Sequence, residues 1–286
     1  MRGRALQSGA SAGVIGFDPH PGEVLSPGGR PRRLTTREQQ ARLFTELGLS
    51  WCWLLPFSPT LASLTPTDFV ELLVETIPLR ELWLGRDFRF GRDRAGDLQF
   101  LRLEGERRGF AVEMFSPVER FGAVISSTRV RTALADGDVE LASELLGRPF
   151  ALEGMVVAGR GEGARLLVAT ANLELAGPTC LPARGVYAGW AEVAGRLVAS
   201  VTNVGVRPTL TEDTRESVEV HLLDWTGDLR GAPLAVHFVS RLRAEKRFEG
   251  IDALRRAVAD DIGSARRILS EGPRAPEPAF DGPSGD

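Results

Sequence analysis

Short segments rich in apolar residues, separated by Gly, Pro and Asp turns, dominate the second half of the chain. Strands at this spacing predict a closed or sandwiched antiparallel sheet. The predicted strands are Leu166–Leu175, Val186–Val193, Leu197–Asn203, Ser217–Asp224 and Leu234–Val239. A helix over Ile251–Leu269 follows, with Ile251, Leu254, Val258 and Ile262 on one apolar stripe.

The first half instead alternates apolar runs with helical patterns. The runs are Val14–Phe17, Trp51–Phe57, Leu82–Leu84 and Ala111–Phe115, and the helices Thr36–Leu47, Pro66–Glu75 and Ala95–Arg108. Thr35 and Thr65 are the predicted N-caps, with Pro66 at a first helical position. This alternation predicts a parallel sheet covered on both faces, which binds ligands at the carboxyl ends of its strands.

Two helices, Thr128–Ala135 and Asp138–Leu146, are expected to close the first half, and Gly147-Arg148-Pro149 then breaks the pattern. We therefore predict an α/β domain over residues 1–148 and a β domain over residues 150–271. The Pro-, Gly- and Asp-rich residues 272–286 are predicted to be a disordered tail.

Composition narrows the functional classes. The net charge of −3 gives no general attraction to nucleic acid, and no apolar run approaches the roughly 18–20 residues that cross a bilayer. Cys52 and Cys180 lack a metal-ligand spacing and are expected to be buried, reduced thiols, as in a cytoplasmic protein. The three histidines form no zinc motif, and no obligate protein partner is evident.

Glu219 interrupts an otherwise apolar strand pattern. It alternates with Val218, Val220 and Leu222, so its carboxylate is expected on the face opposite the apolar one. Glu is uncommon in strand interiors, and an ordinary carboxylate is ionised at neutral pH and able to accept a proton. The alternative is an edge-strand glutamate that points into solvent.

Two further features upstream are consistent with phosphate chemistry. Gly154–Gly163 is rich in glycine, which lets backbone N–H groups approach a phosphate, although a flexible connection has the same composition. Thr170 and Asn172 are spaced to project from one face of an extended strand, and their oxygens suit Mg²⁺. A Thr/Asn pair that merely ends a strand is the alternative.

Four ordered motifs resemble those of riboflavin kinases. They are Gly154–Leu173, which leads into Thr170-Ala171-Asn172, then Asn203–Thr209, Val218–Asp224 and Arg243–Phe248. The resemblance implies a small β-barrel that binds riboflavin and MgATP. Thr170 and Asn172 would hold the Mg²⁺ and phosphates, and Glu219 would accept the proton of the ribityl 5′-hydroxyl. The residues implied in ATP or flavin binding are Gly159, Gly161, Gly163, Asn203, Arg207 and Arg243.

The first half resembles the FMN adenylyltransferase module of bacterial bifunctional FAD synthetases. The matching segments are Phe17–Pro21, Arg33–Thr36, Gly85–Gly91 and Ile125–Arg131. Hydroxyls and an arginine at a helix start also suit a phosphate on physical grounds, with an ordinary N-cap as the alternative. The resemblance implies nucleotide or FMN binding by Asp18, His20, Asp87, Phe88, Ser126, Ser127, Thr128 and Arg129.

The chain departs from the family patterns in both halves. Leu167 and Ala169 replace a glycine and a proline, and Glu162 and Ala164 stand where arginines are common. The adenylyltransferase motif His-x-Gly-His is absent. We expect either a translation start placed too far downstream, which we favour, or a truncated protein, and we expect adenylyl transfer to be crippled in this chain as given.

These patterns predict a Rossmann-like nucleotidyltransferase domain, incomplete at its N-terminus, followed by a flavokinase barrel with a C-terminal helix. The expected function is ATP-dependent conversion of riboflavin to FMN and of FMN to FAD in the cytoplasm, with small molecules as the only partners. The alternatives are a riboflavin kinase alone and a catalytically weak flavin- or nucleotide-binding protein.

Overall fold

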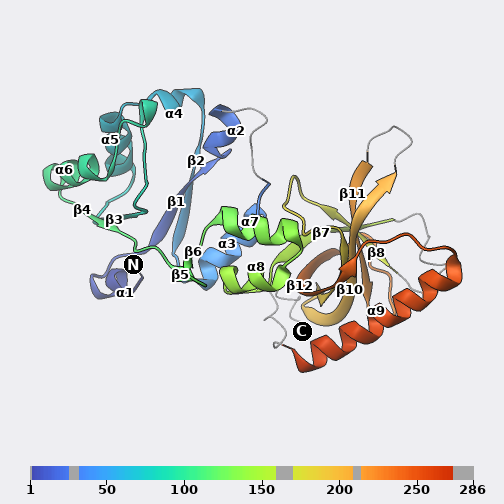
Figure 1. Cartoon of the computed structure of the whole chain (residues 1–286). Coiled ribbons are helices and arrows are strands. Elements are labelled where there is room, and N and C mark those ends of the chain that lie inside the picture. The colour runs from blue at the N-terminus through green and yellow to red at the C-terminus, as the bar shows by residue number, and fades with distance from the viewer. Residues whose placement is uncertain (1, 26–31, 159–169, 209–213, 273–286) are drawn as a thin grey trace. The chain divides into compact units, whose positions relative to one another are not determined.

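The computed structural model describes residues 2–25, 32–158, 170–208 and 214–272 (Figure 1). The chain forms two compact units. The first comprises Met1–Pro31 and Gln40–Val124, and the second comprises Arg32–Gln39 and Ile125–Asp286. The second unit therefore begins before the predicted domain boundary at residues 148–150, because two helices that precede the boundary pack with the barrel. The predicted tail, from residue 273 onward, lies outside the described residues.

The first unit is built from short strands and helices. Its elements are α1 (Arg2–Gln7), β1 (Gly13–Asp18), α2 (Pro21–Leu25), β2 (Trp51–Pro56), α4 (Pro59–Ser63), α5 (Pro66–Thr76), β3 (Glu81–Leu84), α6 (Leu98–Arg108), β4 (Ala111–Met114), β5 (Glu119–Arg120) and β6 (Ala123–Val124). A 3-10 turn covers Arg92–Arg94, and α3 (Arg37–Glu46) precedes β2. All four predicted apolar runs are strands.

The strands of this unit pair in twos. β1 runs parallel to β2 and β3 runs parallel to β4, which confirms the predicted parallel pairing. Over the described residues, however, the two pairs are separate sheets, and β5–β6 is a third. Every residue of β1 and β3 is partly exposed. The two sheets nevertheless share one apolar core, formed around Phe69, Val70 and Leu73 of α5.

The helix starts test the predicted caps. Thr65 caps α5 in a capping box with Asp68, and Pro66 occupies the first turn, as predicted. The prediction of Thr35 for α3 is wrong by one residue. Thr36 accepts from the N–H of Gln39 through its hydroxyl, and the Gln39 side chain accepts from the Thr36 N–H. Both residues are buried, and the reciprocal pair fixes the start of α3.

The second unit contains the predicted closed antiparallel sheet. Six strands form a barrel in the order β10-β11-β8-β7-β12-β9. They are β7 (Ala151–Val157), β8 (Ala171–Leu175), β9 (Gly185–Val193), β10 (Arg196–Pro208), β11 (Thr214–Leu222) and β12 (Pro233–Ala244). The strand β7 was not predicted. The helices α7 (Ser127–Asp136) and α8 (Val139–Leu146) precede the barrel, and α9 (Ile251–Glu271) follows it.

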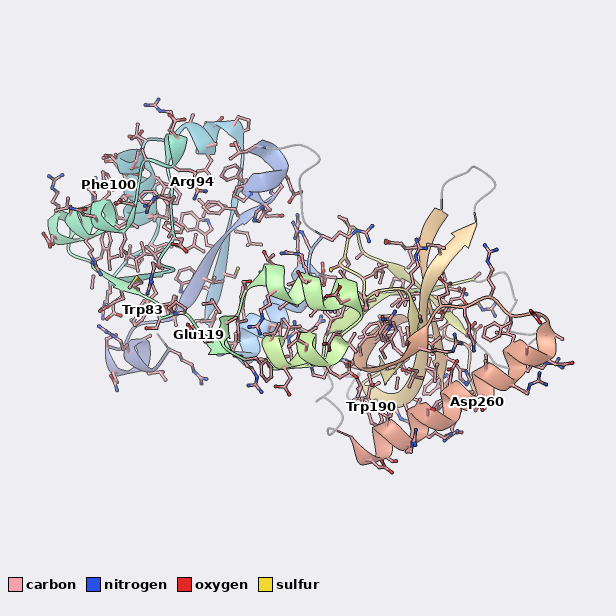
Figure 2. All side chains as sticks on the ribbon, viewed as in Figure 1. Trp83, Arg94, Phe100, Glu119, Trp190 and Asp260 are labelled. Atoms are coloured by element: carbon pink, nitrogen blue, oxygen red, sulfur yellow. The ribbon has the colours of Figure 1, made fainter. Side chains whose placement is uncertain are left out.

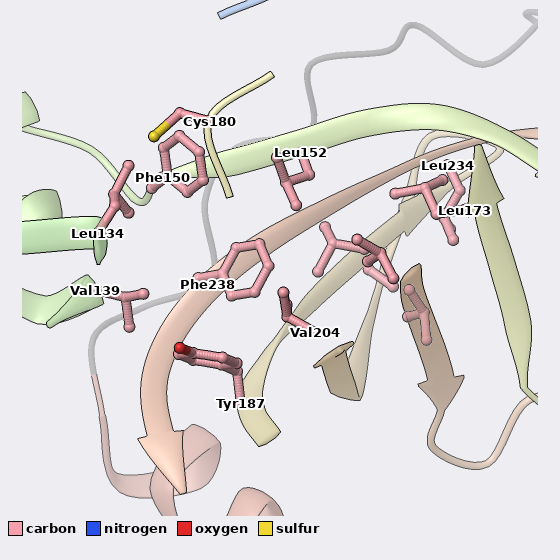
Figure 3. Packing of buried hydrophobic residues seen from close by; sticks show 14 of the residues in the cluster. Leu134, Val139, Phe150, Leu152, Leu173, Cys180, Tyr187, Val204, Leu234 and Phe238 are labelled. Carbon is pink, nitrogen blue, oxygen red and sulfur yellow. The ribbon is translucent and has the colours of Figure 1, made fainter. Parts of the chain in front are cut away.

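The barrel interior is continuous with the core beneath α7 and α8 (Figure 3). Phe238 is fully buried and lies between Phe150 and Tyr187, with ring centroids 6.0 and 5.3 Å away. Leu134 and Val139, from α7 and α8, belong to the same cluster. Burial of these aromatic and aliphatic side chains is the main source of stability in this unit.

Two predictions about burial need correction. Leu254, Val258 and Ile262 of the predicted α9 stripe are partly buried and share their face with the buried residues Asp261, Ala265 and Leu269, but Ile251 is 44% exposed. Cys52 is exposed and only Cys180 is buried, although neither forms a disulfide. Burial raises the pKa of the Cys180 thiol. Among the described helices, none combines the length and apolarity needed to cross a bilayer.

Candidate functional site

One row of directly paired residues runs across all six strands of the barrel. Arg243 pairs with Val186, Val186 with Asn203, Asn203 with Glu219, Glu219 with Asn172, and Asn172 with Val157. Directly opposed residues in an antiparallel sheet share a face. The row therefore brings four of the predicted kinase-site residues, from four strands, to the same level and the same side of the sheet.

Glu219 lies on the outer side of this sheet. Its neighbours Val218 and Val220 are 2% and 0% exposed and belong to the barrel core, so the carboxylate side chain between them points the other way. β11 lies between β10 and β8, with Glu219 paired to both. The alternative of an edge-strand glutamate is therefore wrong. Glu219 is half-buried, and its direct partners on the two neighbouring strands are Asn203 and Asn172. A carboxylate in this position can accept a proton.

Asn172 is the most enclosed member of the row. It is 8% exposed and has Glu219 on one side and Val157 on the other. Thr170 lies one residue before β8 and is half-buried. Strand alternation places Thr170 on the Asn172 face. A hydroxyl, a carboxamide oxygen and a carboxylate form a set of hard oxygen donors, which fits Mg²⁺.

The carboxylate of Glu245 lies over Gly205, near the side chain of Asn203. A Cβ built on Gly205 would lie 2.6 Å from Oε1 of Glu245 and 3.4 Å from Nδ2 of Asn203. A side chain at position 205 would displace the end of the Glu245 side chain, so this glycine leaves space for the carboxylate over β10. Glu245 follows directly after β12, so the end of that strand carries an acidic group to the row. This residue was part of a recognised motif but was not predicted as a site residue.

Arg243 is held firmly in place. Its Nε and Nη2 donate to the carboxylate of Asp261 in α9, at 3.0 and 2.8 Å, and its guanidinium lies 5.4 Å from the ring centre of Phe248. An acidic residue within the buried stripe of α9 was not foreseen, because the apolar period alone defined that stripe. The only sequence signal was an Asp at a buried helical position.

Some predicted kinase residues cannot be placed. Gly159, Gly161 and Gly163 lie outside the described residues, as do Leu167 and Ala169. Arg207 belongs to β10, two residues beyond Gly205, but its side chain is outside the described part. Their assignment to ATP or flavin binding stays a prediction.

The residues of the first unit that were predicted to bind nucleotide or FMN lie at or after the ends of two strands. Asp18 is the last residue of β1, and Asp87 and Phe88 follow β3. A series of rings, Phe17, Phe69, Phe90 and Phe88, connects these two strand ends, with successive centroids 6.3, 5.4 and 5.7 Å apart. The carboxyl ends of parallel strands are the usual ligand-binding edge of such folds.

His20 and Asp87 differ from Phe88 in their exposure. His20 is exposed, and its Nδ1 accepts a hydrogen bond from the Gly22 N–H at 3.1 Å, while the His20 N–H donates to Glu23. Asp87 is exposed as well, whereas Phe88 is partly buried in the aromatic core. His20 and Asp87 are thus at the surface, whereas the Phe88 ring packs with the aromatic core.

The Ser126–Arg129 segment begins helix α7 in the second unit. The Ser126 hydroxyl accepts from the Arg129 N–H at 3.2 Å and so acts as the N-cap. This is the ordinary role that the sequence left open as an alternative. Ser127 and Thr128 are exposed in the first turn, next to the positive end of the helix dipole. Their role in phosphate binding stays a prediction.

Comparison with known proteins identifies both halves. The family model described as FAD synthetase matches residues 1–129, and the model described as riboflavin kinase matches residues 146–269. The bifunctional riboflavin kinase/FMN adenylyltransferase of Pseudomonas fluorescens is 40% identical over 94% of this chain and 86% of its own length. That of Escherichia coli (strain K12) is 38% identical over 90% of this chain and 82% of its own length.

A solved structure has the same fold. The crystal structure described as a macrolide-efflux protein from Streptococcus pneumoniae matches with a TM-score of 0.85 and 29% sequence identity. The match covers 93% of this chain and 86% of that one. With its barrel, its parallel strand pairs and its two family-model matches in order, this chain belongs to the bifunctional riboflavin kinase/FMN adenylyltransferase family and carries an FAD synthetase domain followed by a riboflavin kinase domain.

Proposed function

We propose that this chain phosphorylates riboflavin to FMN with ATP and then adenylylates FMN to FAD. The observation that supports the first step best is the row across the barrel, in which Glu219 lies between Asn203 and Asn172. Phosphoryl transfer depends mainly on positioning and charge neutralisation, with one base that orients the nucleophile. A carboxylate whose direct partners on both neighbouring strands are asparagines suits that base.

The residues of the row have different proposed roles in the phosphoryl transfer. Glu219 accepts the proton of the ribityl 5′-hydroxyl as this oxygen attacks the γ-phosphorus of ATP. Asn203 and Asn172, its direct neighbours on β10 and β8, orient the substrates beside it. ATP or flavin binding is assigned to Arg243, Arg207, Gly159, Gly161 and Gly163. Of these, only the side chain of Arg243 belongs to the described part of the structure.

Thr170 and Asn172 are the proposed Mg²⁺ ligands. Their hydroxyl and carboxamide oxygens, on the same face as Glu219, are hard donors of the kind that Mg²⁺ prefers. A bound Mg²⁺ neutralises phosphate charge during transfer. Substrate phosphates and water would complete its coordination, which is the usual arrangement for this ion.

The second step is assigned to the first unit and to the start of α7. Asp18, His20, Asp87 and Phe88 would bind nucleotide or FMN at the strand ends, and Ser126, Ser127, Thr128 and Arg129 would contact phosphate. This chain would thus carry out both steps in one polypeptide. Its substrates are small molecules of the cytoplasm, where we place the protein.

One assay separates the candidate functions. Purified protein is incubated with riboflavin and MgATP, and FMN and FAD are resolved by chromatography. Both products support the bifunctional enzyme, and FMN alone supports the kinase. Absence of both products, with riboflavin still bound, would instead support a flavin-binding protein.

Substitution of Glu219 tests the base. E219Q keeps the size of the side chain but removes the carboxylate, and we expect FMN formation to fall at least 100-fold, the lower end of the contribution of a general base. E174Q, in an exposed glutamate of β8, is the matched control and should be unaffected. With FMN supplied directly, E219Q should form FAD at the wild-type rate. Undiminished FMN formation by E219Q would end the assignment.

A further inference from the structure

Asp261 is an acidic residue in the buried face of a helix. It lies in the middle of α9, is 7% exposed and shares its stripe with Ala265 and Leu269, which are 0% and 7% exposed. An isolated buried carboxylate is costly, so such a group is found where it is paired. Its partner is Arg243 of β12.

The contact between the two side chains is bidentate. Nε of Arg243 donates to Oδ1 of Asp261 at 3.0 Å and Nη2 donates to Oδ2 at 2.8 Å. The remaining Nη1 donates to the backbone carbonyl of Ala244 at 3.2 Å. Phe248 lies against the guanidinium, 5.4 Å from ring centre to Cζ. The planar fork of the arginine is therefore fixed in one orientation.

The Arg243–Asp261 pair is connected to the row of directly paired residues that crosses the barrel and contains Asn203, Glu219 and Asn172. Arg243 is the end member of the row, and its partner Val186 pairs directly with Asn203. β12 ends one residue later, at Ala244, and the next residue, Glu245, places its carboxylate over Gly205 and beside Asn203. The contact of Arg243 with Asp261 therefore fixes the end of β12, and with it the position of Glu245.

We propose that Asp261 is a positioning residue of the kinase site. Its bidentate contact sets the orientation of the Arg243 guanidinium and holds the end of β12 in place. Arg243 and Glu245 then contact the substrate from fixed positions. Helix α9 would then contribute to substrate binding although it lies outside the barrel sheet. This inference rests on the proposed kinase function.

The principal test is D261N, compared with D260N. Asp260, labelled in Figure 2, is the exposed neighbour of Asp261 on the same helix and serves as the matched control. We expect D261N to raise the KM for riboflavin on the order of tenfold, with a smaller change in kcat, because a charge-assisted contact that orients a binding group is lost. D260N should match the wild type.

A double-mutant cycle separates positioning from simple stabilisation. If Asp261 acts through Arg243, the effects of D261N and R243K on KM should be markedly non-additive. D261E retains the charge but lengthens the side chain, so it should fold and still raise KM. It provides the measurement if D261N does not fold.

Two outcomes would overturn the proposal. One is a D261N variant whose kinetics equal those of D260N. The other is a fall in kcat that follows the loss of folded protein, measured by thermal unfolding, with KM unchanged. Riboflavin affinity is measured in parallel by quenching of flavin fluorescence. A wild type that binds riboflavin but forms no FMN would contradict the proposed function, while the effect of D261N on affinity would still decide the role of Asp261.

Discussion

The two units of this chain pair their strands in different ways. In the second unit each barrel strand has a neighbour on both sides, so the sheet closes and has no free edge. In the described part of the first unit, β1 and β3 each pair with only one strand, and the sheet is divided in two. Both units bury an apolar core, around Phe69, Val70 and Leu73 in the first and within the barrel in the second, but of the described sheets only that of the second unit closes around its core.

This difference has a direct effect on burial. Val218 and Val220 of the barrel are 2% and 0% exposed, whereas all residues of β1, including Val14 and Ile15, are partly exposed. A strand rich in apolar residues at successive positions is typical of a sheet covered on both faces. The described candidate kinase residues therefore lie on a closed sheet, whereas four candidate adenylyltransferase residues, Asp18, His20, Asp87 and Phe88, lie at or after the ends of strands that each pair with one neighbour.

The largest expected effect comes from matched truncations of two phenylalanines. F238A removes a fully buried ring between Phe150 and Tyr187 and should lower the free energy of unfolding of the barrel unit by about 3–5 kcal/mol. F17A removes a partly exposed ring of β1 and should cost less, about 1–2 kcal/mol.

Denaturant titrations monitored by hydrogen exchange of each unit would measure both losses separately, since a single two-state fit does not suit two units. Equal losses in the two variants would show that the first unit encloses its core as well as the barrel does.

Hydrogen exchange of the wild type gives the second comparison. Amides of β10, which lies between β9 and β11, should be protected at least about tenfold more than amides of β1 and β3. Mass spectrometry of peptides that cover these strands makes the measurement. Similar protection in β1, β3 and β10 would contradict the difference in pairing.

A smaller effect is expected from two buried hydroxyls of β10. The Ser200 hydroxyl donates to the carbonyl of Gly189 at 3.1 Å, whereas the Thr202 hydroxyl has no hydrogen-bond partner among the described residues. T202V removes an unsatisfied polar atom and should stabilise the protein by about 1 kcal/mol. S200A removes a satisfied one and should destabilise it by about the same amount. Thermal unfolding of both variants measures these changes in stability. A loss of stability in T202V would indicate that the Thr202 hydroxyl has a hydrogen-bond partner.

Much of the fold could be predicted from the sequence because local patterns determine it. The apolar runs placed β1 to β4, and Thr65 with Pro66 marked the start of α5. The number of strands that pair in one sheet is not a local property, so the division of the first sheet was missed. β7 was missed because its glycine, Gly154, suggested a loop, whereas it allows close approach of the Glu174 backbone.

The site was predictable only in part, for a related reason. Motifs identified Asn172, Asn203, Glu219 and Arg243 one strand at a time, but their alignment in one row depends on strand register. Asp261 escaped because the apolar period excludes a charged residue from the buried face of a helix. Only a partner from a distant strand, Arg243, makes that position stable for a carboxylate.

The smallest expected effect is a difference between the two units in how acid destabilises them, through Glu104 in the first unit and Asp224 in the second. The hydrogen bonds from Arg108 and Arg107 hold the pKa of Glu104 below its ordinary value, and all three residues belong to α6. The hydrogen bonds from Arg266 lower the pKa of Asp224, and this pair joins the turn after β11 to α9 at 2.7 and 2.8 Å. Loss of the Glu104 contacts should therefore loosen one helix, while loss of the Asp224 contact should loosen α9 from the barrel.

The sign of the pH dependence follows from the lowered pKa of Asp224. Because the folded-state pKa is below the unfolded value of about 4, the pair stabilises the attachment of α9 fully above that pH. The contribution is lost as the pH falls through the folded-state pKa. The pair is exposed, so the effect should be small and should shrink further at high salt. NMR titration of the carboxylate, with exchange of the α9 amides between pH 5 and 2, measures it. D224N should remove this part of the acid response, and an Asp224 that titrates at its ordinary pKa would show that the contact with Arg266 is not maintained in solution.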